Sequence, residues 1–248
     1  GMPVPKQDPR AQEKSDHRTQ LADVMEMAVQ YFRLQLRTQA GSAARRYLDG
    51  RGLDEKALDR WEIGFAPDSW QGLWDHLRSK NIEEKLILGA GLAKPSNKGG
   101  KPYDTFRGRI MYPIRDARGR AIAFGGRAMD PNDNAKYLNS PETELFDKGR
   151  SLFNHAPART AAGKGQQLIV AEGYMDVIAT HQAGTENTIA TCGTAITAQQ
   201  LKLIKRYTKN IAFAFDQDSA GLEATFRAIE LAQIAEVNIK IISIPEGK

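Results

Sequence analysis

Cysteine is nearly absent from this 248-residue chain, because Cys192 is the single cysteine. A disulfide framework or a cysteine-based zinc site needs several thiols, so neither can be built within these residues. With no partner for nucleophilic chemistry, Cys192 itself is most simply a small buried side chain. A reducing cytoplasm fits this composition, and we expect a cytoplasmic protein.

Long apolar runs are lacking as well. No stretch approaches the ~20 apolar residues that a membrane-spanning helix needs, and the N-terminus lacks the basic-then-apolar order of a signal peptide. We therefore expect no membrane partner. Charged residues make up 26% and hydrophobic residues 41% of the chain. These values are ordinary for a folded protein, so disordered and fibrous classes are excluded.

The positive charge is concentrated in the first part of the chain. Residues 1–163 carry 27 Lys and Arg against 21 Asp and Glu, whereas residues 164–248 carry 8 against 9. Residues 94–150 alone hold 12 basic against 7 acidic side chains. This pattern suggests a polyanion bound beside an acidic site. A solvated basic face without a ligand would give the same charge count.

Residues 1–15 are rich in proline and charge, which predicts a disordered lead-in. From residue 16, apolar side chains recur at helical spacing as far as Leu36. Shorter helices are expected at 42–49 and 54–60. Residues 107–127 contain two apolar runs around a turn-forming Asp-Ala-Arg-Gly segment, and they predict a β-hairpin.

The pattern becomes regular after an Ala/Gly-rich linker at 161–165. Strands are expected at 168–171, 188–191, 211–215 and 239–244, and helices at 174–182, 197–207 and 219–235. Strands that alternate with helices predict a parallel sheet with right-handed crossovers. We therefore predict an α/β protein, with a mixed α+β basic subdomain at 16–163 and a parallel-sheet domain at 164–248.

Acidic side chains stand at the ends of two of these strands. Glu172 follows the strand 168–171, and Asp216 follows 211–215, with Asp218 two residues later. If the two strands are neighbours, the three carboxylates meet at the edge where parallel sheets bind ligands. Their repulsion would require a compensating cation, and oxygen ligands favour Mg²⁺ or Mn²⁺. Asp176, in the first turn of the next helix, fits a capping role and a catalytic role equally well.

Several motifs carry a resemblance to a known family. Ala-Glu-Gly-Tyr-Met-Asp at 171–176, Cys-Gly-Thr at 192–194 and Phe-Asp-Gln-Asp-Ser-Ala-Gly at 215–221 resemble the Toprim motifs of DnaG-type bacterial primases. Upstream segments match too, among them Phe-Arg-Gly-Arg-Ile-Met-Tyr-Pro-Ile at 106–114 and Lys-Tyr-Leu-Asn-Ser-Pro-Glu at 136–142. The resemblance covers nearly the whole chain beyond residue 20, and this ordered series is highly specific.

The resemblance implies a Toprim-type second domain and a DNA-directed RNA polymerase that makes short RNA primers on single-stranded DNA. Divalent Mg²⁺ or Mn²⁺ would be held by Glu172, Asp216 and Asp218, with Asp176 as a further catalytic residue. Two such ions would activate the primer 3′-hydroxyl and neutralise the incoming ribonucleoside triphosphate. The family's essential basic positions are matched by Arg51, Arg127, Lys136 and Lys148, which would grip nucleotide or template phosphates. Arg107 and Arg109, on the preceding strand, are expected to line the same groove.

Without the motif match, each basic residue fits a structural role better. Arg51 between two glycines and Lys148 fit turns, and arginines on strands must face outward at alternate positions. The family's zinc-binding domain and its helicase-binding domain have no counterpart here, so we expect zinc and helicase contacts outside this chain. A metal-binding acidic segment is also expected beyond Lys248, and we expect this fragment to be weakly active or inactive.

Two other readings remain open at this point. The chain could be another Toprim enzyme, a topoisomerase or a nuclease. A topoisomerase needs a positioned tyrosine nucleophile, and a related nuclease class carries an ATPase, for which no Walker-type loop is present. The chain could also be a non-catalytic module that binds single strands. Intact Glu172, Asp216 and Asp218 disfavour that reading.

Overall fold

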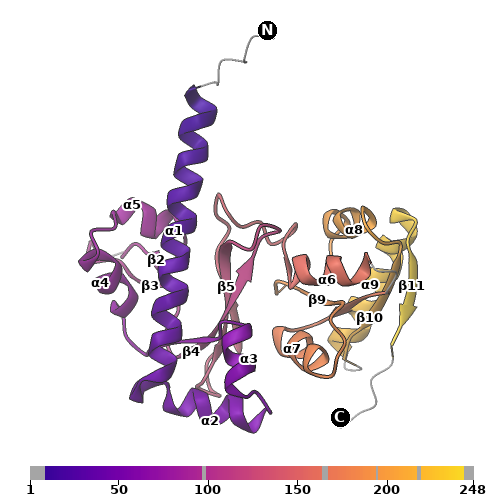
Figure 1. Ribbon diagram of the computed structural model, residues 1–248, viewed down its shortest axis with the longest axis horizontal. Helices are drawn as coiled ribbons and strands as arrows, with labels where there is room; N and C mark the ends of the chain where they lie inside the picture. Colours follow the sequence, from indigo (N-terminus) through magenta and orange to yellow (C-terminus); the bar gives the residue numbers. More distant parts are fainter. Residues whose placement is uncertain (1–8, 97–98, 164–166, 194, 217–218, 243–248) are drawn as a thin grey trace.

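The computed structural model describes residues 9–96, 99–163, 167–193, 195–216 and 219–242. It arranges the chain in two halves that lie side by side, with the long helix α1 (Pro9–Arg37) in the first and a mostly parallel sheet in the second (Figure 1). Asp218, one of the predicted metal ligands, lies outside the described residues, as does the end of the strand expected at 239–244.

The first half is built on a four-stranded antiparallel sheet in the order β1-β4-β5-β6. Its strands are β1 (Gly64–Ala66), β4 (Arg109–Arg115), β5 (Ala121–Ala128) and β6 (Tyr137–Asn139). The strands β4 and β5 form the predicted hairpin, with Asp116 accepting hydrogen bonds from the turn and from Arg120. The apolar stripe of α1 packs on this sheet, where Phe32 meets Phe124 edge to face.

Short elements surround this sheet. They are η1 (Gln39–Gly41), α2 (Ser42–Gly50), α3 (Glu55–Arg60), α4 (Gly72–Ser79), α5 (Glu84–Gly89), β2 (Ala93–Lys94) and β3 (Tyr103–Asp104). The expected helices at 42–49 and 54–60 are confirmed as α2 and α3, and the Asp54 side chain caps α3 by accepting from Ala57 N. The buried Asp104 side chain likewise caps α4, because its carboxylate accepts hydrogen bonds from Leu73 N and Trp74 N.

The second half contains a five-stranded sheet in the order β11-β10-β8-β9-β7. Its elements are β7 (Leu152–Phe153), α6 (His155–Ala162), β8 (Leu168–Ala171), α7 (Tyr174–Gln182), β9 (Thr188–Thr191), α8 (Ala198–Lys205), β10 (Asn210–Ala214), α9 (Ser219–Ala235) and β11 (Asn238–Ile241). The strands β8 to β11 pair in parallel, as predicted. The reciprocal capping box between Thr197 and Gln200, which starts α8, is also confirmed.

Two expectations require correction. Residues 9–15 were expected in the disordered lead-in but are helical, because α1 begins at Pro9, where a proline is tolerated in the first turn. The strand β7 pairs antiparallel with β9, so the second sheet already includes residues that precede the expected domain boundary at 163/164. Alanines of α6 join the core of this second sheet.

One of the two hydrophobic clusters of the molecule extends across both halves, and the other lies within the second half. Tyr174 and Val177 of α7 belong to the same buried cluster as Phe32 and Phe124 of the first half. This continuity fixes α7, and the sheet edge from which it starts, against the first half. Within the described residues, no helix combines the length and hydropathy needed to cross a bilayer.

Candidate active site at the carboxyl edge of the parallel sheet

The strands that carry the two predicted carboxylates are neighbours. Ala171 of β8 pairs with Ala214 of β10, so both strands end at the same edge of the sheet. Glu172 follows β8 directly, and its Oε1 accepts a hydrogen bond of 2.8 Å from the backbone N–H of Asp216. The sequence-based expectation that the strand ends bring Glu172 and Asp216 together is therefore met by the fold.

Gly221 explains how the helix after β10 can pass so close to this pair. A Cβ built at Gly221 would collide with the Asp216 carbonyl oxygen and would stand 2.8 Å from Glu172 Oε1. A residue without a side chain is therefore required in the first turn of α9. The Asp-Gln-Asp-Ser-Ala-Gly motif thus contains a steric requirement as well as its acidic residues.

Asp176 lies in the first turn of α7, where its carboxylate accepts from the backbone N–H of Gly173 at 2.9 Å. Desolvation by the surrounding protein raises the pKa of Asp176, and the negative charge of Asp216 raises it further. The Gly173 N–H and the positive charge of Arg51 act in the opposite direction. Asp176 is therefore a helix cap that also lies within the electrostatic field of the Asp216 carboxylate.

Among the residues that the structure describes, no three His, Cys, Asp or Glu side chains are arranged to hold a metal ion. The predicted third ligand, Asp218, is outside that set. What the described residues do provide is an oxygen-only donor pair, Glu172 and Asp216, at adjacent strand ends. The negative charge of Asp216, which raises the pKa of Asp176, would be balanced by a divalent cation, so the donor set fits Mg²⁺ or Mn²⁺.

Two of the predicted cations of the first half lie at the same aromatic ring. The guanidinium of Arg127 stacks on the Tyr47 ring at 4.1 Å from its centroid, and Arg51 lies at 5.4 Å from the same ring. Tyr137, which pairs with Arg127 across β5 and β6, has its pKa raised by burial and by the charge of Asp176. Tyr47 thus holds two arginines, and the charge of one of them, Arg51, acts on Asp176 of the second half.

Arg109 does not join this group, contrary to the sequence-based assignment. It is 5% exposed and donates to Asp133 at 2.6 Å and to the carbonyl of Ala135 at 2.8 Å. On β5, Arg127 and Gly125 share the face that meets Tyr174, whereas Arg109 pairs with Ala128 and so points to the opposite face. Arg109 holds the loop before β6 and is not displayed to a ligand.

The other predicted cations occupy three different places. Lys136 is exposed just before β6, at the same end of the sheet as Arg127. Lys148 is half-buried, its carbonyl accepts from Gln200 at 3.0 Å, and its charge reaches Cys192 at the end of β9. Burial raises the pKa of that cysteine to about 12, which suits the inert role assigned to it. Arg107 lies over the indole ring of Trp70.

Side chains that the sequence reasoning missed join the halves next to this edge. Asn139 of β6 donates to the Cys192 carbonyl at 3.0 Å and accepts from the Tyr174 hydroxyl. Gly193, at a φ of +79°, leaves room for the Asn139 amide, and Gly125 leaves room for the Tyr174 ring. Asn139 and Gly193 both belong to motifs that carry the resemblance, but nothing in a sequence shows that these two motifs touch.

A pocket of about 350 Å³ opens beside Glu172 at the carboxyl edge. Thr191 and Gly193 of the β9 end and Glu223 and Arg227 of α9 contribute to its lining. The pocket is thus bordered by the carboxylates of Glu172 and Glu223 and by the guanidinium of Arg227. It is the cavity that a ligand of the Glu172 and Asp216 edge would enter.

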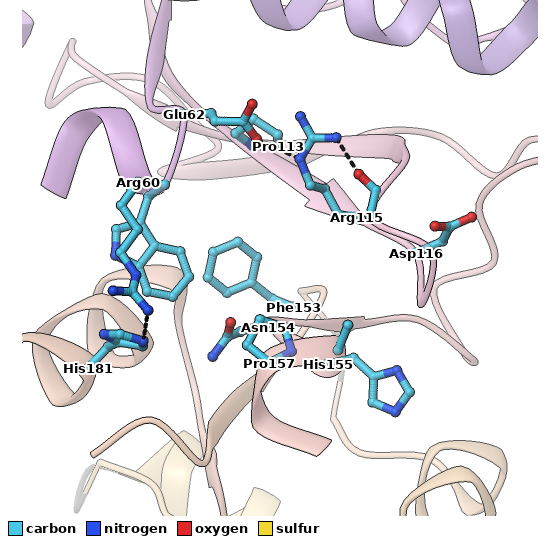
Figure 2. A pocket seen from close by; sticks show the side chains of 13 residues that line it. Arg60, Glu62, Pro113, Arg115, Asp116, Phe153, Asn154, His155, Pro157 and His181 are labelled. Atoms are coloured by element: carbon cyan, nitrogen blue, oxygen red, sulfur yellow. Dashed lines mark hydrogen bonds and ion pairs between the residues drawn. The ribbon is translucent and has the colours of Figure 1, made fainter. Parts of the chain in front are cut away.

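A second pocket, of about 240 Å³, lies between the halves (Figure 2). It is mainly apolar, with Trp61 stacked on Phe153 at 5.5 Å, and Arg60 donates to His181 Nε2 at 2.8 Å on one side. Burial and the charge of Arg60 lower the pKa of His181, so its neutral imidazole accepts this bond. No described carboxylate or cation predicted for the active site lines this pocket.

Both halves of the chain match families of known proteins. Residues 31–159 match the family described as DNA primase catalytic core, N-terminal domain, and residues 169–248 match a Toprim-like family. The DNA primase of Deinococcus radiodurans is 43% identical over 229 residues, which cover 92% of this chain and 39% of the relative. This chain belongs to the DnaG-type primase family.

Other primases give the same result. The DNA primase of Pseudomonas putida is 41% identical over the entire chain, which covers 38% of that relative. The crystal structure of a DNA primase domain from Pseudomonas aeruginosa superposes with a TM-score of 0.86 at 41% identity, covering 92% of this chain and 72% of the other. A DnaG primase catalytic domain bound to single-stranded DNA gives 0.83 at 35% identity, with 94% and 74% covered. The chain spans about two fifths of the length of these curated relatives.

Proposed function

We propose that this chain carries the polymerising site of a primase, which copies single-stranded DNA into short RNA primers from ribonucleoside triphosphates. The observation that carries the proposal is the meeting of Glu172 and Asp216 at adjacent strand ends, next to Asp176, on which the positive charge of Arg51 from the first half also acts. An acidic edge on which a fixed cation acts suits a reaction between a metal-bound triphosphate and a nucleic acid strand.

The carboxylates are the proposed ligands of Mg²⁺ or Mn²⁺, with Asp218 as the third. Such ions, when bound, would activate a 3′-hydroxyl and neutralise the triphosphate. The backbone N–H of Asp216 orients Glu172, and the Gly173 N–H orients Asp176, so both carboxylates are held before any ligand arrives. Fixed donors of this kind avoid reorganisation during the reaction.

The cations of the first half are proposed to bind phosphates. Arg51 and Arg127 are held on Tyr47, while exposed Lys136 extends the positive surface along the same end of the sheet. Lys148 would act from the segment that links the halves. That this chain binds DNA is supported by relatives whose solved structures contain single-stranded or double-stranded DNA.

Other parts of the proposed function extend beyond this chain. The RNA primer would leave along the surface that binds the template, and a replicative helicase would be contacted by segments outside these residues. Zinc would likewise belong to another domain. We propose a cytoplasmic location, since chromosomal template and nucleotide substrates are found there in bacteria.

The test is template-directed incorporation of ribonucleotides on single-stranded DNA by the full-length gene product. Asp216→Asn should lower the rate by about 10² to 10³, because one charge-stabilising group is lost at the reacting phosphate. It should leave retention on DNA unchanged. The control Asp147→Asn removes an exposed carboxylate that pairs with Arg150, and its rate should equal that of wild type.

Each alternative reading gives a different result in the same assay. A non-catalytic module would retain DNA without incorporation by the wild-type protein. A topoisomerase or a nuclease would relax or cut the DNA and incorporate nothing. If Asp216→Asn incorporated ribonucleotides at the wild-type rate, the carboxyl edge would have no part in the mechanism.

A further inference from the structure

Trp70 is an exposed tryptophan in the basic half of the molecule. Its side chain is 61% exposed, although tryptophan carries one of the largest apolar surfaces of any residue. The other two tryptophans of the chain are covered, since Trp74 is 5% exposed and Trp61 packs on Phe153. Displaying an indole to solvent loses hydrophobic stabilisation, so a ligand that covers it would recover that stabilisation.

A cation and a second ring accompany the indole. The guanidinium carbon of Arg107 stands 4.1 Å from the centre of the Trp70 ring and 5.5 Å from that of Tyr103. Trp70 and Tyr103 meet edge to face at 5.6 Å. Lys94, which is exposed, pairs with Tyr103 across β2 and β3. The surface therefore presents aromatic faces and positive charge together.

This group is held by the backbone. Asp104 N donates to the Trp70 carbonyl at 2.7 Å, and Arg107 Nη1 donates to the Asp104 carbonyl at 2.7 Å. The buried Asp104 carboxylate is in turn fixed by the first N–H groups of α4. The indole, the phenol ring and the guanidinium are thus oriented from a single anchored residue, and little conformational entropy remains to be lost on binding.

The group also lies at the end of the sheet where the proposed phosphate-binding cations are found. Gly108, which follows Arg107, accepts from Met129 N at 3.0 Å, and Ala128 N donates to the carbonyl of Lys136 at 2.9 Å. The start of β4, the end of β5 and the start of β6 are therefore adjacent. The Trp70 group and the cations Arg127 and Lys136 therefore lie at the same end of this sheet.

From these observations we propose that Trp70, Tyr103 and Arg107 form a stacking platform for an unpaired base of the single-stranded DNA template. The proposal rests on the proposed function. Bases stack on aromatic side chains without regard to sequence, and arginine adds a cation–π contribution and a phosphate partner. Trp70 supplies the stacking surface, and Arg107 joins it to the backbone-binding cations.

The test compares two probes with the intact chain: a single-stranded thymidine oligonucleotide and an abasic sugar-phosphate strand of the same length. Trp70→Ala should weaken binding of the oligonucleotide roughly 5- to 100-fold, which corresponds to the loss of one base stack. The affinity for the abasic strand and the salt slope of binding should both stay unchanged, since no phosphate contact is removed. Trp70→Phe should retain most of the affinity for the oligonucleotide.

The matched control is Phe226→Ala, which removes an aromatic ring of similar exposure from α9, and it should bind both probes like wild type. An unchanged affinity of Trp70→Ala for the oligonucleotide would overturn the platform. An equal loss of affinity for both probes, together with a smaller salt slope, would also overturn the platform. The indole would then act only by positioning Arg107. A wild-type chain that binds neither probe would contradict the proposed function itself, and the platform with it.

Discussion

Gly221 is the residue at which helix α9 passes closest to the two carboxylates. Replacing it with alanine would place a methyl group against the Asp216 carbonyl and 2.8 Å from Glu172 Oε1. Backbone atoms cannot yield as a flexible side chain does, so Gly221→Ala should lower the free energy of unfolding by about 1–3 kcal/mol. Urea unfolding would measure the change.

Gly50→Ala provides the comparison, because a Cβ at this last residue of α2 meets no atom within 4 Å. This variant should be no less stable than wild type. Equal stability of the Gly221 and Gly50 variants would mean that α9 can move away from Glu172, and the close packing described for this edge would then be incorrect.

Individual residues show which features of the site can be predicted from the sequence. The meeting of Glu172 with Asp216 was predictable, because both follow apolar strands and parallel strands end at one edge. The burial of Arg109 was not, since it depends on the loop that brings Asp133 and Ala135 over the guanidinium. Strand alternation gives two faces but does not tell which of them a distant loop will cover.

The contact between β6 and α7 joins the two halves through hydrogen bonds. Asn139→Ala would remove the partner of the Tyr174 hydroxyl and a donor to the Cys192 carbonyl, both in a buried setting. Leaving such groups unsatisfied costs about 1–3 kcal/mol, so thermal or denaturant unfolding should show a loss of that size.

Asn238→Ala is the matched change on the surface. The Asn238 amide donates to Asn210 at 3.1 Å in an exposed setting, so its loss should alter stability by less than about 0.5 kcal/mol. If the two asparagine variants lost the same amount, the Asn139 contacts would contribute no more than a surface pair, and the junction would depend on apolar packing alone.

Elements with strong local signals were predictable, whereas those defined by distant pairing were not. The helix expected at 174–182 has those bounds in the structure, and α8 starts at its capping box. The strand β7 has two residues, too few to show any periodicity, and it exists because β9 pairs with it. The boundary expected at 163/164 therefore did not anticipate that Leu152, Ala158 and Ala162 pack in the core of the second sheet.

The whole molecule places basic side chains of one half beside carboxylates of the other. If Lys136 contacts a template phosphate, Lys136→Ala should reduce the salt slope of single-strand binding by about 0.7, the contribution of one released counterion. Fluorescence anisotropy at several salt concentrations would measure it. Lys202→Ala, an exposed lysine on α8, should leave the slope unchanged. A wild-type salt slope for the Lys136 variant would show that Lys136 is a solvated surface residue without a phosphate contact.

Titration of the chain with Mn²⁺ would show whether the edge formed by Glu172 and Asp216 binds a divalent cation. Calorimetry requires no enzymatic turnover, so it reports on the carboxylates themselves. We predict millimolar or tighter binding by the wild-type chain and by Asp147→Asn, and at least tenfold weaker binding by Asp216→Asn. Equal affinity of Asp216→Asn and wild type would show that the cation binds elsewhere and would contradict binding at this edge.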